Sequence, residues 1–268
     1  PIMMGIEHER IHLETSSVLI RQLPIEQVDQ LEQWSMCQES GEAPENELLP
    51  VSGKQFKLGK PFGHPLYGWD NEYGYLPVDV KDFSASKYLV SNHEYLAFVK
   101  DGGYNNERWW TDEGWRWVNY RNLGRPLFWV KVGDSYQLRT MVSVIDMPWN
   151  WPVEVNQLEA AAYCQWLSGK TGKSIRLPTE EEWYALYHHC EVKDLPEWRE
   201  KAPGNINLEY QASSCPVDQH KFKEFYDVIG NVWQWTETPI TGFPGFKVHP
   251  LYDDFSVPTF DMKHNLIK

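Results

Sequence analysis

Tryptophan is the residue that most constrains the fold of this chain, because 14 of its 268 residues are Trp. Many of them stand beside residues that favour turns, as in Trp109-Trp110 and Trp149-Asn150-Trp151. Large aromatic side chains bury much surface each, so such a chain holds its loops together by aromatic packing rather than by long helices. We therefore expect a loop-rich fold in which most Trp side chains serve as core and loop anchors.

Composition excludes several classes of protein. Hydrophobic residues make up 41% and charged residues 24% of the chain, which is enough apolar material for a buried core. The net charge of −13 argues against nucleic acids and anionic membrane surfaces as partners. No apolar run approaches the roughly 20 residues that span a bilayer, and the N-terminus lacks the basic region of a signal peptide. We expect a cytoplasmic protein.

The four cysteines do not suggest a metal or disulfide framework. Cys37, Cys164, Cys190 and Cys215 form no CxxC pair, and their spacings are irregular. Cys164 lies within the apolar stretch 160–167, where it is expected to act as a small core residue. This usage agrees with a reducing compartment.

The first 50 residues differ from the rest in composition and in hydrophobic pattern. Apolar residues recur at near-helical spacing from Gly5 to Leu23, and Pro24 is expected to stop this helix. A single amphipathic helix cannot bury its face alone, so we expect partner helices that this chain does not contain. Residues 25–50 are polar and acidic and are interpreted as a linker, with a short helix around Glu26 to Met36.

From residue 51 onward, glycines separate short segments that alternate between strand and helix patterns. Lys54 to Leu58 and Phe83 to Val90 are predicted strands. Three helices are expected, each with a capping residue: Asn92 to Lys100 after Ser91, Gln157 to Lys170 after Asn156, and one that begins after Thr179. Residues 230–268 are rich in Pro and Gly and carry few helix signals. The pattern is of the α+β class.

The sharpest chemical signal is the sequence HERIHLE at residues 8–14. On a helix, His8 and His12 lie one turn apart on one face, so both imidazoles can reach a single metal ion. Glu14 lies about 200° around the helix from His12, which predicts a supporting rather than a ligating role. A solvated histidine pair on the surface is the alternative that spacing alone leaves open.

The same letters match the HExxH pattern of zinc proteases, with Glu9 as general base. The longer form of that pattern requires a glycine and a third histidine where this chain has Thr15 and Val18. Such proteases also need a sheet before the helix, and only seven residues precede His8. This interpretation is disfavoured.

A longer segment, HERIHLETSS at residues 8–17, resembles the iron-binding helix of the sulfoxide synthases of ergothioneine and ovothiol biosynthesis. That helix belongs to a DinB-like four-helix bundle, so residues 1–24 are interpreted as its last helix. Residues 51–268 resemble the formylglycine-generating-enzyme (sulfatase-modifying-factor, C-type-lectin-like) fold. The matching segments are GWDNE (68–72), VSNHEY (90–95), PVEV with AAYCQWL (152–155 and 161–167), RLPTEEEW (176–183) and GNVWQWT (230–236).

Most of these segments are structural in that fold, so Asp70, Asn71, Trp233 and Trp235 are first interpreted as fold residues. Formylglycine-generating enzymes use a cysteine pair and copper, and no such pair is apparent in this chain. The combination of metal helix, linker and this fold points instead to the sulfoxide synthases.

The resemblance implies Fe(II) as cofactor, with L-cysteine, L-histidine and dioxygen as substrates. It implies that His8 and His12 bind the metal and that an earlier helix, absent here, supplies a third histidine. The segment PLYDDFS at 250–256 resembles the one that carries the active-site tyrosine, so Tyr252 is the catalytic candidate. Arg10, Asp70 and Asp254 are possible counter-charges for substrate head groups, among which no motif selects.

Resemblance at residues 8–24 and 252–260 favours the ovothiol branch, whose product is 5-histidylcysteine sulfoxide. The ergothioneine branch, which uses trimethylated histidine, stays open, as does a non-catalytic C-type-lectin-like binding module. The resemblance also implies that the C-terminal part of the fold and a methyltransferase domain are absent from this chain.

Overall fold

The computed structural model describes residues 1–268 except 30–31, 33, 194–203 and 209–210. The α-helices are α1 (Ile2–Ile20), α2 (Asn92–Lys100), α3 (Asp112–Arg121), α4 (Gln157–Thr171) and α5 (Glu180–His189). The strands are β1 (Leu48–Val51), β2 (Lys54–Leu58), β3 (Leu76–Val80), β4 (Phe83–Ser86), β5 (Trp129–Val132), β6 (Ser135–Arg139), β7 (Val144–Asp146), β8 (Lys221–Phe222), β9 (Phe225–Tyr226), β10 (Trp235–Pro239) and β11 (Asn265–Ile267). Short 3-10 helices fill several connections, among them η1 (Ile25–Gln27), η2 (Asp70–Glu72), η3 (Gly103–Asn105), η4 (Glu107–Trp109) and η6 (Val257–Thr259).

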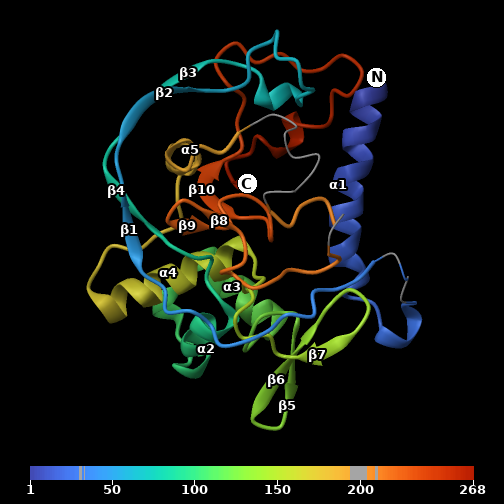
Figure 1. Cartoon of the computed structure of the whole chain (residues 1–268), viewed down its shortest axis with the longest axis vertical. Coiled ribbons are helices and arrows are strands. Elements are labelled where there is room, and N and C mark those ends of the chain that lie inside the picture. Colours follow the sequence, from blue (N-terminus) through green and yellow to red (C-terminus); the bar gives the residue numbers. More distant parts are fainter. Residues whose placement is uncertain (30–31, 33, 194–203, 209–210) are drawn as a thin grey trace.

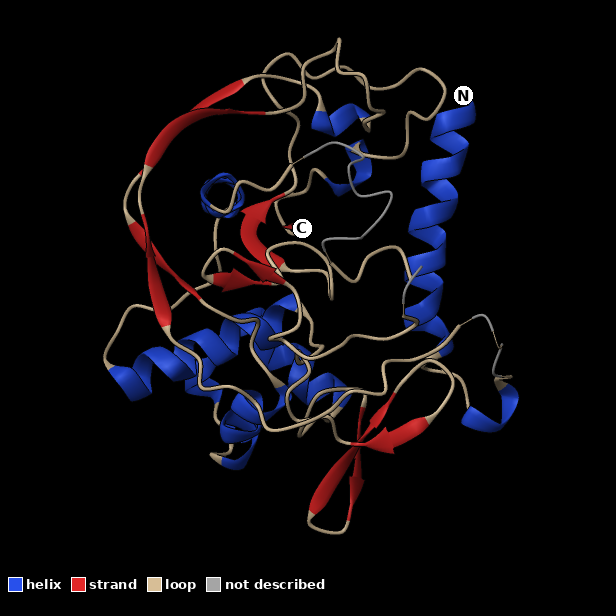
Figure 2. Ribbon diagram, viewed as in Figure 1, coloured by secondary structure: helices blue, strands red, loops and turns tan. Residues whose placement is uncertain are grey.

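The strands form small antiparallel sheets rather than one large one (Figure 1). β1 pairs with β4, β2 with β3, β8 with β9 and β10 with β11, while β5, β6 and β7 form a three-stranded sheet. Loops connect these pieces through most of the molecule, as the tan segments of Figure 2 show. The expected loop-rich α+β fold is confirmed.

Three helix starts follow the predicted capping chemistry. In α2, α4 and α5 the side chains of Ser91, Asn156 and Thr179 accept a hydrogen bond from the backbone N–H three residues on. In each case a glutamate at that third position bonds back to the capping residue, which completes a capping box. Local sequence was sufficient to predict these starts.

Three other boundaries differ from the sequence-based expectation. α1 ends at Ile20 rather than Leu23: the N–H groups of Gln22 and Leu23 donate three residues back, to Leu19 and Ile20, and Pro24 has no N–H to continue the helix. The strand expected over Phe83 to Val90 ends at Ser86: the side chain of Asn46 bonds both the N–H and the C=O of Tyr88, which replaces a strand partner. The helix expected at Glu26 to Met36 appears only as η1, and part of that range lies outside the described residues.

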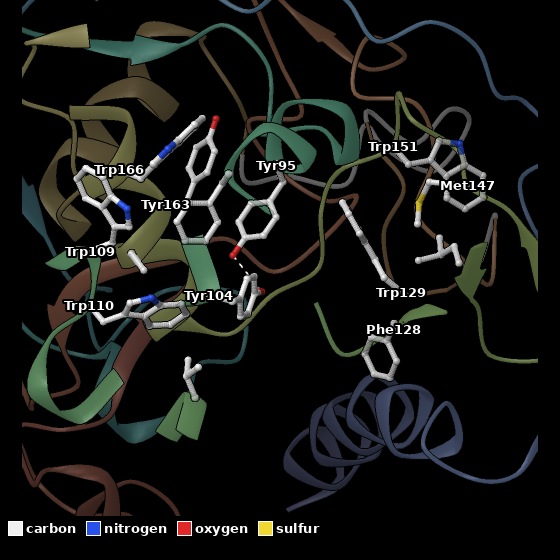
Figure 3. Close-up of a cluster of buried hydrophobic side chains, with 14 of the residues drawn as sticks. Tyr95, Tyr104, Trp109, Trp110, Phe128, Trp129, Met147, Trp151, Tyr163 and Trp166 are labelled. Carbon is white, nitrogen blue, oxygen red and sulfur yellow. Dashed lines mark hydrogen bonds between the residues drawn. The ribbon is translucent and has the colours of Figure 1, made fainter. Parts of the chain in front are cut away.

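Aromatic side chains dominate the core, as the Trp content predicted. The main cluster combines Tyr95 of α2, Tyr163 and Trp166 of α4, and the loop residue Trp151 (Figure 3). Phe98 of α2 also belongs to it. Further members are Tyr104, Trp109, Trp110, Phe128, Trp129 and Met147. The four cysteines are buried and free, and burial raises the pKa of the Cys164 thiol to about 12.

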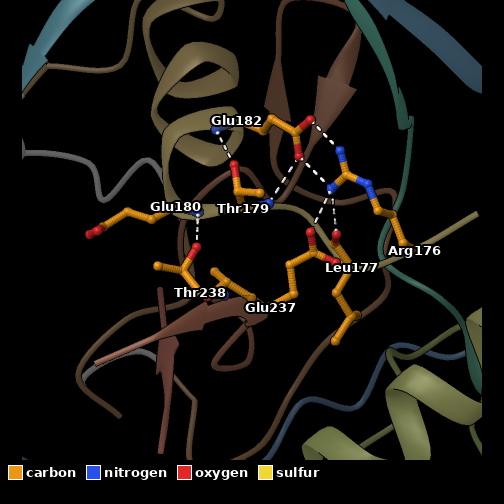
Figure 4. Close-up of polar contacts among 8 residues, drawn as sticks. Arg176, Leu177, Thr179, Glu180, Glu182, Glu237 and Thr238 are labelled. Carbon is orange, nitrogen blue, oxygen red and sulfur yellow. Dashed lines mark hydrogen bonds and ion pairs between the residues drawn. The ribbon is translucent and has the colours of Figure 1, made fainter. Parts of the chain in front are cut away.

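The segment RLPTEEEW ties α5 to β10 (Figure 4). Arg176 donates through both terminal nitrogens to Glu182 and also reaches Glu237 on β10. The N–H of Glu180 donates to the hydroxyl of Thr238. These contacts support the structural interpretation of this segment.

Helix α1 lies along one side of the molecule (Figure 1). Its N-terminal end lies beside loops from the last part of the sequence, which are red in the figure. Its far end is anchored by Arg21, which forms an ion pair with Glu154, donates to the Arg139 carbonyl and stacks 3.7 Å from the ring of Phe128. Arg139 in turn donates to the Leu23 carbonyl. No helix among the described residues is both long and apolar enough to cross a membrane.

Candidate active site

The two histidines of α1 and Tyr252 meet at one point, although they come from opposite ends of the sequence. The Nε2 atoms of His8 and His12 lie 3.2 Å apart, as expected for residues one helical turn apart. The phenolic oxygen of Tyr252 lies 3.2 Å from the same Nε2 atom of His8. Both imidazole edges and the phenol therefore face a common space at the N-terminal half of α1.

The arrangement of these nitrogens fits a shared cation. The Nδ1 atom of His8 lies 3.5 Å from the exposed carboxylate of Glu9, and its Nε2 atom is the one that faces His12 and Tyr252. Two lone pairs 3.2 Å apart repel each other unless a proton or a metal ion lies between them. Within the part of the chain that the structure describes, no group of three or more His, Cys, Asp or Glu residues converges on a metal position.

Glu14 lies on another face of α1 and contacts the folded domain. Its Oε2 atom accepts a hydrogen bond of 2.8 Å from the indole N–H of Trp233. Burial raises the pKa of Glu14, and the bond from Trp233 partly opposes that shift. Trp233 is 42% exposed, unlike most core tryptophans, so it serves as a polar contact to α1 rather than as a buried anchor.

Two of the candidate counter-charges are already engaged. Arg10 forms an ion pair with Glu7 at 3.0 Å on the exposed side of α1. Asp70 is buried and accepts hydrogen bonds from the backbone N–H of His249 and the hydroxyl of Ser256. Asp70 is therefore a fold residue, as first interpreted, and its carboxylate is not free to bind a substrate head group.

A cavity of about 1840 Å³ opens between α1 and the domain. Its wall includes Glu14, Arg21 and Trp233, but His8, His12 and Tyr252 are not among the residues that line it. The cavity thus approaches the histidine site from the side on which α1 contacts the domain.

Sequence comparison identifies the family of the larger part of the chain. Residues 35–245 match the family model described as Sulfatase-modifying factor enzyme 1-like domain. The chain belongs to this family. Hercynine oxygenase from Mycolicibacterium thermoresistibile is 32% identical over 77% of this chain and 46% of that protein. Hercynine oxygenase from Mycobacterium tuberculosis is 31% identical over 80% of this chain and 51% of that protein.

The chain thus spans about half the length of these curated relatives. Among solved structures, PvdO from Pseudomonas aeruginosa is similar with a TM-score of 0.45 and 19% identity, over 71% of this chain and 70% of that one. The family match agrees with the expected fold class.

Sequence reasoning did not find Trp233 as the partner of Glu14, nor Asp70 as the residue that holds the segment around Tyr252. Both belong to segments that look structural, and the partners lie 219 and 179 or more residues away. The one available signal was the angular position of Glu14, which points its side chain away from the histidine face.

Proposed function

We propose that this chain forms part of an iron- and dioxygen-dependent sulfoxide synthase that joins the sulfur of L-cysteine to the imidazole ring of L-histidine. One observation carries the proposal: His8, His12 and Tyr252 converge within hydrogen-bond distance across 244 residues of sequence. The similarity to hercynine oxygenases supports oxygen chemistry of this kind.

The overall reaction balances without a further reductant. A thiol, an aromatic C–H bond and dioxygen give a sulfoxide and water, so the two substrates supply all four electrons that dioxygen accepts. Oxidation of the thiol alone, by contrast, places both oxygen atoms on sulfur and gives a sulfinate. The protein must therefore favour coupling over this simpler reaction.

His8 and His12 would hold iron through their Nε2 atoms, and we propose that a third histidine comes from a segment that precedes residue 1. Imidazole nitrogens are suitable ligands for ferrous iron, and a facial set of three leaves positions open for substrates. Bound iron would favour the thiolate form of cysteine and activate dioxygen.

Tyr252 supplies the acid–base group of the site. Its hydroxyl, 3.2 Å from Nε2 of His8, lies where a proton or hydrogen atom can be delivered to a group held beside the histidines. Glu14 and Trp233 fix α1 against the domain, so that His8 stays opposite the phenol.

The acceptor defines a second candidate function. The relatives are named for hercynine, the trimethylated form of histidine, which favours an acceptor of the ergothioneine branch. The resemblance of residues 8–24 and 252–260 to the ovothiol branch favours unmodified histidine instead. The two acceptors differ only at the amino group, so the product formed with each of them decides the branch.

The test uses the full-length protein loaded anaerobically with Fe(II). Oxygen uptake is measured with cysteine alone, with cysteine plus histidine, and with cysteine plus trimethylhistidine, and the products are identified by mass. Uptake that requires histidine and yields the coupled sulfoxide supports the proposal. Uptake only with trimethylhistidine assigns the ergothioneine branch, and absence of both iron binding and uptake refutes the proposed function.

A further inference from the structure

We infer that Asp70 is a positioning residue that fixes the hydroxyl of Tyr252 opposite His8, and thereby sets the ratio of coupled sulfoxide to cysteine sulfinate. The inference rests on the proposed function and deepens it, because it names the residue that controls the outcome of the reaction. It depends on how the segment around Tyr252 is attached to the rest of the fold.

The carboxylate of Asp70 bonds both sides of the segment that carries Tyr252. Its Oδ2 atom accepts a hydrogen bond of 3.0 Å from the backbone N–H of His249, three residues before Tyr252. Its Oδ1 atom accepts from the hydroxyl of Ser256, four residues after Tyr252. Asp70 and Ser256 are 8% and 2% exposed, so water cannot readily replace these bonds.

The residue before Asp70 supports the phenol ring itself. The indole of Trp69 stacks on Phe255 with 3.9 Å between ring centroids, and it meets the ring of Tyr252 edge-on at 6.1 Å. Phe255 also contacts Tyr252 at 5.2 Å. One dipeptide, Trp69-Asp70, therefore fixes both the backbone and the ring of the tyrosine segment.

The base of this attachment is itself held in place. Asp70 begins η2, and Glu72 at the end of η2 accepts from the N–H of Trp69 and forms an ion pair with Lys60 at 3.0 Å. The tyrosine segment, by contrast, contains no helix or strand between Pro239 and Val257. With few backbone bonds of its own, its position follows that of Asp70.

Small displacements of the phenol should change the chemistry more than the fold. Effective proton delivery requires heavy atoms at about 2.6–3.2 Å, and a shift of about 1 Å in a reacting group reduces rates strongly. A loosened segment would leave the histidines in place while the hydroxyl moves away from them. Oxygen activation would then continue, but a larger share of cysteine would leave as sulfinate.

The experiment compares S256A and D70A with D70N in the full-length iron-loaded protein. S256A removes one of the two bonds and D70A removes both, whereas asparagine keeps an acceptor for the His249 N–H and an amide that can donate to the Ser256 oxygen. S168A is the matched control, because Ser168 on α4 also holds a loop through its hydroxyl, which donates to the Ile175 carbonyl.

We expect the fraction of sulfinate to rise several-fold in S256A, to approach the Y252F value in D70A, and to return toward wild type in D70N. S168A should leave the ratio unchanged at a comparable loss of thermal stability. A ratio in S256A and D70A equal to that of wild type would overturn the inference, as would an equal change in S168A.

A second readout does not depend on turnover. In protein labelled with 3-fluorotyrosine, the ¹⁹F resonance absent from Y252F identifies Tyr252. D70A and S256A should shift or broaden that resonance, while D70N and S168A should not. If Y252F itself leaves the product ratio unchanged, the role of Tyr252 in the proposed function fails. If Y252F changes the ratio but S256A and D70A change neither ratio nor resonance, only the role of Asp70 fails.

Discussion

The Nε2 atom of His8 lies 3.2 Å from the hydroxyl oxygen of Tyr252, and the two residues are 244 positions apart in the sequence. His8 is fixed by helix α1, whereas Tyr252 is held by a loop that depends on Asp70 and Ser256. The candidate site therefore lies at a contact between a helix and a loop, and its geometry depends on how each is anchored to the domain.

Replacing Tyr252 with phenylalanine should redirect the reaction rather than abolish it. The variant keeps the ring contacts with Trp69 and Phe255. It loses the hydroxyl group that lies against Nε2 of His8. We expect oxygen uptake to persist while the product shifts from coupled sulfoxide toward cysteine sulfinate, as measured by quantitative mass spectrometry. An unchanged product ratio would exclude the proposed role of the phenol.

Replacing His12 with glutamine should weaken iron binding without unfolding the chain. The histidine side chain lies at the surface of α1, and the hydrogen bond that the structure gives it joins it to His8. Mutation of a residue that only hydrogen-bonds to a metal ligand reduces metal affinity by about 10–100-fold. Removal of the ligand itself should therefore reduce iron affinity by more than about tenfold. Anaerobic Fe(II) titration measures the affinity, and H64Q is the control. Equal iron affinity in H12Q and wild type would show that His8 and His12 are a solvated surface pair and not metal ligands.

The contact between Glu14 and Trp233 should stabilise the attachment of α1. W233F removes the indole N–H, so the half-buried carboxylate of Glu14 loses its donor. A double-mutant cycle with E14A should give a coupling energy of about 1 kcal/mol, the usual range for one hydrogen bond. Hydrogen exchange should increase in α1 but not in α4. A coupling energy near zero would mean that the contact does not hold the helix.

Glu159 should make stability depend on pH. Burial raises the pKa of this carboxyl from 4.5 to about 7, although Tyr104 donates a hydrogen bond to it. The folded protein then binds this proton more tightly than the unfolded chain, so the contribution of Glu159 to stability is fully present below about pH 4.5 and is lost as pH rises through about 7. A shift of this size corresponds to about 3 kcal/mol.

Chemical denaturation across this range tests the assignment. E159Q should lose that part of the pH dependence and gain stability relative to wild type at neutral pH. Y104F should extend the decline to higher pH, because the bond from Tyr104 lowers the pKa of Glu159. An identical pH profile in wild type and E159Q would show that another group causes any decline.

The sequence by itself determined those features whose cause lies within a few residues. Ser91, Asn156 and Thr179 start helices because their side chains bond an N–H three residues on, and the glutamates at those positions bond back. His8 and His12 share a face because a helix repeats every 3.6 residues. The density of tryptophan predicted an aromatic core, since such side chains must be buried somewhere.

The tertiary structure alone decided which distant residues meet. The strand predicted to reach Val90 stops at Ser86 because Asn46, from another segment, bonds Tyr88. Trp233 contacts Glu14, and Asp70 holds the segment of Tyr252, through hydrogen bonds that no local pattern encodes. Periodicity specifies the face on which a side chain lies, but its partner depends on how the whole chain closes around the core, and that is settled only by packing.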